Sequence, residues 1–238
     1  MKINHRQQGF VLITALIFLL VLSLLGVAAV RSTLFEERLA GNDTDKAFAR
    51  ENAELAMRDA ERDILGRRFD NTMCAPAACT NMRPLGTRPV SATSTLPFWI
   101  ATSNDIADLA LSEVGQSTGN ANTAGFFNAQ TAAACGLNIP VWSGANWQDG
   151  VNRACAGAIT VALNTVAYGF HTDAPFLAAP NVPRPRYIIE VFTADELGIG
   201  GGTSGKFYFR VTTVGFGRNA GVGGLRTSVT LQSVYSPN

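Results

Sequence analysis

The hydrophobic pattern of this 238-residue chain begins with one long apolar run. Twenty-one residues without a charge extend from Phe10 to Val30, and Arg31 follows them. An α-helix of about 20 mostly apolar residues is long enough to cross a bilayer. The pattern therefore predicts that residues 10–30 form a transmembrane helix.

The next segment, residues 31–68, mixes charged and apolar positions at helical spacing. Charges of opposite sign lie four residues apart, as in Glu54 and Arg58, and no proline precedes Pro76. The apolar or small residues that we expect to share one narrow face are Phe48, Leu55, Ala56, Ala60, Ile64 and Leu65. The transmembrane helix should thus continue as an amphipathic helix to about Arg68, with Gly41-Asn42 as a possible kink.

The middle of the chain, residues 69–185, is rich in Ala, Asn, Thr, Ser, Gly and Pro and has few charges. It reads as a variable, loop-rich head region, with a short helical pattern at 104–114. Residues 186–238 differ, because segments 186–192, 206–214 and 225–235 are rich in β-branched and aromatic residues and are separated by glycine-rich turns. They predict an antiparallel β-meander with one face on the long helix, and hence an α+β fold.

The nine residues before the apolar run form a leader whose only formal charges are Lys2 and Arg6. A secretory signal peptide has a shorter apolar run and a small-residue cleavage site after it. Here the run is longer and Arg31 follows, so cleavage after it is not expected. The positive-inside bias keeps Lys2 and Arg6 in the cytoplasm and predicts that the chain after Arg31 lies beyond the membrane.

Gly9-Phe10, between a short basic leader and an uninterrupted apolar helix, resembles the start of type IV pilins. The resemblance implies that a prepilin peptidase cuts between Gly9 and Phe10 and that Phe10 is then N-methylated. It also implies a pilin-like fold, with a long N-terminal helix on a C-terminal sheet. The fifth residue after the cut is usually Glu in pilins, and here it is Thr14, which offers only a hydroxyl.

Several further blocks resemble the PilX family of minor pilins, in which that Glu is commonly absent. They are Glu37-Arg38-Leu39-Ala40-Gly41-Asn42, Ala47-Phe48, Ala53-Glu54, Ala60-Glu61 and the terminal Leu231-Gln232-Ser233-Val234-Tyr235. The resemblance implies that the chain primes type IV pilus assembly with other minor pilins and supports motility and adhesion. The major pilin is a further partner that the resemblance suggests. It would lie in the inner membrane with a periplasmic head before assembly and in the pilus afterwards.

Two other interpretations stay open at this point. A minor pseudopilin at the tip of a type II secretion pseudopilus would also lack the Glu. An unprocessed, signal-anchored periplasmic enzyme or binding protein would retain Met1.

The four cysteines, Cys74, Cys79, Cys135 and Cys155, all follow the apolar run. An even number in an oxidising compartment predicts two disulfides, with three possible connectivities. Pairing of nearest neighbours is favoured because it closes two short loops in the least regular region. A zinc site is the alternative, but the closely spaced pairs typical of zinc ligands are missing.

Candidate catalytic motifs are weak. The glycine-rich stretch 200–206 resembles a phosphate-binding loop, but Phe207 follows Lys206 and a strand is expected where a helix is needed. His171 is the only histidine after the leader and is expected in a loop. Asp59, Glu61 and Asp63 are spaced by two residues and should point to different faces of the helix. Asp195-Glu196 is a possible calcium ligand pair, although acidic turns are usually only solvated.

The net charge is small. It is +1 for the whole chain, and removal of Lys2 and Arg6 would leave −1 on the side chains. This balance gives no reason to expect a nucleic-acid surface. We expect no catalytic residue, no metal and no cofactor.

Overall fold

The computed structural model describes part of the chain, in two compact units. The described residues are 8–72, 125–128, 140–145, 147, 154–155, 161–162, 164–176, 182–193, 196–198, 207–220, 224 and 226–236. The first unit is Met1–Asp45 and the second is Lys46–Asn238. Met1 to Gln7, the helical pattern at 104–114, Asp195 and the glycine-rich stretch 200–206 lie outside the described residues, as do Cys74, Cys79, Cys135 and the side chain of Cys155.

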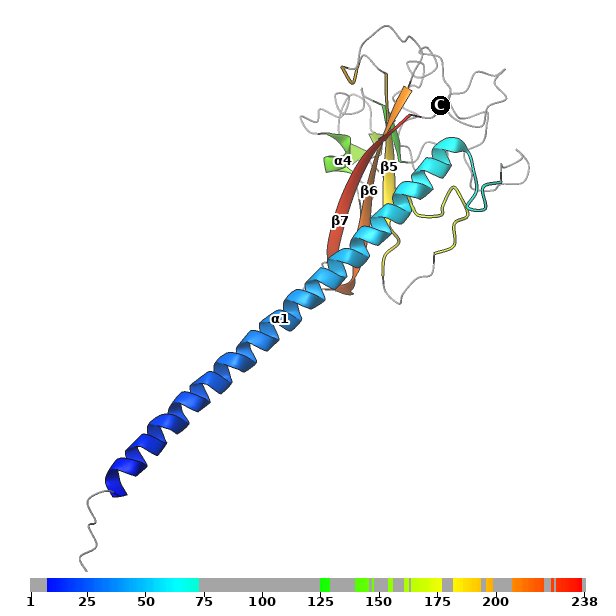
Figure 1. The fold of residues 1–238 in the computed structure, drawn as a ribbon. Helices are drawn as coiled ribbons and strands as arrows, with labels where there is room; N and C mark the ends of the chain where they lie inside the picture. The colour runs from blue at the N-terminus through cyan, green and yellow to red at the C-terminus, as the bar shows by residue number, and fades with distance from the viewer. Residues whose placement is uncertain are drawn as a thin grey trace, which may run out of the picture. The chain divides into compact units, whose positions relative to one another are not determined.

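Helix α1 (Gln8–Leu65) is 58 residues long and contributes to both units (Figure 1). Its apolar beginning gives the one helix, among the described residues, that is long and apolar enough to cross a membrane, with a mean hydropathy of 3.0 over the best 18-residue window. The predicted continuation of the apolar run into the charged segment is therefore observed as one helix.

Helix α1 ends at Leu65, three residues before the expected end near Arg68. Gly66 has a φ of 66°, and its N–H donates to the carbonyl oxygen of Asp63 at 3.1 Å. The N–H of Arg67 donates to the carbonyl oxygen of Arg62 at 2.9 Å. These two bonds form a Schellman cap, which glycine favours because it adopts positive φ without strain.

The second unit is built on a sheet whose main strands are β5 (Arg186–Thr193), β6 (Phe207–Ala220) and β7 (Arg226–Tyr235). Strand β6 lies between the other two and is antiparallel to both. Tyr187 faces Thr213 in the first ladder, and Thr213 faces Leu231 in the second. The meander predicted from alternating and β-branched residues is confirmed.

The region expected to be loop-rich adds strands that the sequence pattern did not reveal. Strand β1 (Phe126–Asn128) pairs in parallel with β5, and β4 (Val166–Ala167) pairs with β5 in antiparallel fashion. The sheet is thus mixed: its three long strands form the predicted antiparallel meander, and β1 adds one parallel pairing. Strands of two and three residues are too short to show a period in the sequence.

Two smaller features complete the described structure. Strands β2 (Ala154–Cys155) and β3 (Val161–Ala162) form a separate antiparallel pair. Helix α4 (Val141–Gly144) is one turn long.

The hydrophobic core lies between α1 and one face of the sheet (Figure 1). Helix α1 contributes Ala60 and Ile64, and the sheet contributes Phe126, Val166, Tyr187, Ile189, Val191, Phe209 and Val211. The sheet residues alternate along each strand, as expected when one face packs on a helix.

Candidate functional site

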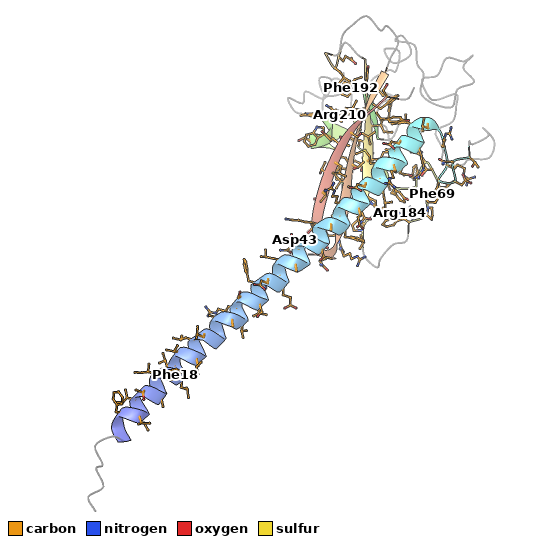
Figure 2. The ribbon with its side chains drawn as sticks, viewed as in Figure 1. Phe18, Asp43, Phe69, Arg184, Phe192 and Arg210 are labelled. Atoms are coloured by element: carbon orange, nitrogen blue, oxygen red, sulfur yellow. The ribbon has the colours of Figure 1, made fainter. Side chains whose placement is uncertain are left out.

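The apolar beginning of α1 is a large exposed surface. Phe10 is 73% exposed, and similar values continue to Leu25 at 61%. Figure 2 shows side chains such as Phe18 extending outward from the helix. Exposed apolar residues also follow the run, at Leu34, Phe35 and Leu39. A patch of this size is covered in a working protein by lipid or by another protein.

Thr14, which stands where pilins usually have Glu, is satisfied within its own helix. Its hydroxyl lies 3.1 Å from the carbonyl oxygen of Phe10 and 3.0 Å from that of Val11, and both geometries allow donation. A hydroxyl bonded in this way is stable in an apolar environment without a partner from a neighbouring subunit. Thr14 therefore does not require the amine that a buried carboxylate would require.

The predicted processing residues occupy the beginning of the same helix. Gly9 and Phe10 lie in the first turn of α1, which begins at Gln8. Among the described residues this turn carries no acidic side chain.

The buried face of α1 in the second unit differs from the predicted one. Ala56, Ala60 and Ile64 are buried as expected, but Leu55 is 41% exposed and Phe48 is only half-buried. The other buried positions of α1 in this unit are small or polar, namely Ala49, Asn52, Ala53, Asp59 and Asp63. The prediction was wrong at Leu55 because it selected large side chains, whereas the face uses small ones.

Close approach of β6 explains why these side chains are small. A Cβ placed on Gly215 would lie 2.0 Å from the carbonyl oxygen of Ala49 and 2.3 Å from the backbone nitrogen of Ala53. The hydroxyl of Thr213 donates to the carbonyl oxygen of Ala53 at 3.0 Å. The amide Nδ2 of Asn52 donates to the carbonyl oxygen of Phe216, also at 3.0 Å. The backbones of β6 and α1 therefore lie very close together, and hydrogen bonds join the strand to the helix.

Two aspartates one turn apart on α1 form the second polar contact. Oδ2 of Asp59 accepts a hydrogen bond from the N–H of Gly169 at 2.7 Å, and Oδ1 accepts one from the hydroxyl of Thr172. Oδ2 of Asp63 accepts a hydrogen bond from the hydroxyl of Tyr187 at 3.0 Å. Burial raises the pKa of Asp59 to about 6, although the bonds from Thr172 and Gly169 oppose this shift.

The prediction that Asp59, Glu61 and Asp63 lie on different faces was wrong for one pair. Asp59 and Asp63 are four residues apart, so they share a face, and both are fully buried. The sequence signal for this shared buried face was the four-residue spacing of the aspartates, together with Ala56, Ala60 and Ile64 on the same side of the helix. In this structure both aspartates accept hydrogen bonds from other parts of the protein.

His171 and Glu190 are two further buried titratable residues of the described chain. His171 is buried, and its ring packs edge-on against Phe170 at 4.8 Å between ring centroids. Glu190 is buried and paired with Arg210 through two bonds of 2.7 and 2.8 Å, and the Arg210 guanidinium stacks on Phe192. Within the part of the chain that the structure describes, no three His, Cys, Asp or Glu side chains gather where they could hold a metal.

A long helix that is apolar and exposed at its beginning, and packed on a largely antiparallel sheet at its end, defines a pilin-like α+β protein. The chain belongs to the PilX family: residues 8–58 match the PilX N-terminal family, and residues 85–237 match the C-terminal family of type IV pilus assembly protein PilX. Comparison with curated proteins and with solved structures gave no match. The chain is thus a structural component that acts with other pilus components in type IV pilus assembly.

Proposed function

We propose that this protein is a minor pilin that primes type IV pilus assembly together with other minor pilins, and that it thereby supports motility and adhesion. The observation that carries the proposal is the division of α1. Its beginning exposes large apolar side chains, while its end is fixed to the sheet. Such a chain can be held by lipid before assembly and by the helices of partner pilins afterwards.

Processing is the first step of the proposed function. A prepilin peptidase at the inner membrane would cut between Gly9 and Phe10, and the new terminus would be N-methylated. The leader carries Lys2 and Arg6, which supports its retention in the cytoplasm and a periplasmic location for the second unit.

Mass spectrometry of the N-terminus tests this step. We expect a mature chain that begins with methylated Phe10, and Gly9→Leu should leave the precursor uncut. An intact Met1 in the pilus-forming cell would contradict the pilin role and favour an unprocessed anchor.

Thr14 supports a specialised position in the filament. Because its hydroxyl is satisfied by carbonyl oxygens of its own helix, the subunit needs no amine from a neighbour at this position. We infer that it enters early, where no earlier subunit offers that amine. We therefore expect the Thr14 hydroxyl itself to contribute little to pilus assembly.

Thr14→Val and Thr14→Glu test this inference as a matched pair. Thr14→Val keeps the shape and removes only the hydroxyl, so we expect near wild-type pilus numbers by electron microscopy. Thr14→Glu places a carboxylate in the bilayer and should leave pilus numbers unchanged or lower them. An increase in pilus number with Thr14→Glu would show that a neighbour's amine is available, against an early position.

Partners can be identified before filaments form. Cross-linking from Leu34 or Phe35 in membranes that lack the major pilin should capture other minor pilins.

Gene deletion should reduce piliation, twitching and the incorporation of minor pilins. Wild-type piliation in the deletion strain would contradict the assembly role, and capture of secretion-system pseudopilins would move the chain to the type II system.

A further inference from the structure

Helix α1 is joined to a surface turn by a buried carboxylate. The turn comprises residues 168–173 and follows β4. Asp59 accepts one hydrogen bond from the backbone N–H of Gly169 and one from the side chain of Thr172, so both of its oxygens bind the turn. Asp59 is fully buried, so its carboxylate is shielded from solvent.

The turn is held at other points by contacts that do not involve Asp59. The carbonyl oxygen of Thr172 accepts a hydrogen bond from the N–H of Phe69 at 2.9 Å, and the Asp173 carboxylate pairs with Arg68 at 2.9 Å. The Arg68 pair is partly exposed and should contribute little. Loss of the Asp59 bonds would therefore loosen the turn locally, and the core of the second unit would remain.

The turn presents an apolar side chain to the outside. Phe170 is 42% exposed, while Tyr168 and His171 beside it are buried. Gly169 has a φ of 78°, which the turn requires and which other residues rarely adopt. The position of Phe170 on the surface thus depends on how firmly the turn is closed.

We propose that Asp59 is an acid-strengthened latch, whose protonation closes the turn 168–173 on α1 and fixes the exposed Phe170. Desolvation is the physical cause. A buried carboxylate is disfavoured when it is charged, and the two hydrogen bonds only partly offset this cost. Protonated Asp59 can donate to the Thr172 hydroxyl and still accept from Gly169, so the closed turn loses no bond. The proposal does not depend on the pilus role.

The direction of the pH effect follows from the two states of the turn. When the turn is closed, the pKa of Asp59 is about 6. When the turn is open and Asp59 is solvated, the pKa returns to its ordinary value near 4. The closed state therefore binds more protons between these values and is favoured as the pH falls through 6.

Other titratable or charged groups lie around the latch and define the controls. They are Arg62 and Asp63 on α1, Tyr168, His171 and Asp173 on the turn, Tyr187 on β5, and Arg68 after the helix. The substitution of Asp59 described below separates its titration from that of these groups.

Hydrogen exchange of the full chain in detergent micelles tests the proposal. The probe is the peptide containing residues 167–173, and exchange rates are corrected for the intrinsic pH dependence. Protection should be about tenfold higher at pH 5 than at pH 7.5, because the opening equilibrium follows the protonation of Asp59. Equal protection at both pH values, or lower protection at pH 5, would overturn the proposal.

Two variants and one control make the test specific. Asp59→Asn keeps a group that can bond both Gly169 and Thr172 but cannot titrate, so the acid increase should disappear. Thr172→Val keeps the carboxylate and removes a bond to its charged form, so the midpoint should move to higher pH. Glu61→Gln changes a partly exposed acid on the same helix and should leave the wild-type profile. Persistence of the acid increase in Asp59→Asn would assign it to another group and refute the latch.

Discussion

The two parts of helix α1 use opposite kinds of side chain. From Phe10 to Leu39 the helix carries large apolar residues, and the described chain leaves them exposed. From Ala49 to Ile64 the buried positions are mostly alanine, asparagine and aspartate. A count of apolar residues would therefore place the buried face in the wrong part of the helix.

The difference shows that distance to the neighbouring element decides which residues are buried. Strand β6 approaches so closely that Gly215 has no room for a Cβ, and only small or hydrogen-bonding residues fit on the helix opposite it. No strand of the described chain covers the apolar beginning, whose side chains are exposed. Its large side chains suit a loosely defined apolar environment, such as lipid tails or neighbouring helices.

Among the substitutions that test this comparison, Gly215→Ala should have the largest effect on stability. The new methyl group would collide with backbone atoms of Ala49 and Ala53, which cannot rotate away as a side chain would. We expect a loss of about 3 kcal/mol in the free energy of unfolding, at the upper end of overpacking effects. Chemical denaturation of the full chain in micelles, followed by tryptophan fluorescence, measures it.

Gly41→Ala is the matched control in the first unit. Nothing lies within 4 Å of a Cβ built at this helical glycine, so the change should stabilise the helix by up to about 1 kcal/mol. Strand propensity alone would make Gly215→Ala stabilising, because glycine weakens a strand interior, so unchanged or increased stability of this variant would contradict the close approach.

Leu20→Arg tests the role of the exposed half. A charge near the middle of the apolar run should disfavour membrane insertion by about 3 kcal/mol. The fraction of protein that resists carbonate extraction from membranes should fall, while Leu20→Phe should leave it unchanged. Equal extraction of the two variants would show that lipid does not cover this surface.

Asn52→Ala should have a smaller effect, and Asn42→Ala on the same helix is its control. Asn52 is buried and donates to Phe216, so its removal leaves a carbonyl oxygen without that donor. We expect a loss of about 1.5 kcal/mol in the free energy of unfolding. Asn42 is exposed on α1, and Asn42→Ala should cause no loss. A loss with Asn42→Ala alone would reverse the assignment of the buried face.

Local patterns predicted much of the fold. The apolar run, the continuous helix and strands β5 to β7 follow from hydropathy, helical spacing and β-branched residues, each read within one segment. The small strands β1 and β4 were missed because they are formed by pairing with β5 and have no period of their own. Leu55 was misplaced for a related reason, since its exposure depends on a sheet that lies far along the chain.

The sequence by itself predicted the membrane segment, because insertion into a bilayer depends mainly on the length and polarity of the segment itself. The processing site at Gly9-Phe10 and the special position of Thr14 were likewise inferred from position in the sequence, and both stay predictions. Only the tertiary structure decided the partners of Asp59, because Gly169 is 110 residues away, and only it showed why Gly215 must lack a side chain. Such contacts arise when distant segments meet, and no local pattern records which donors will reach a buried carboxylate.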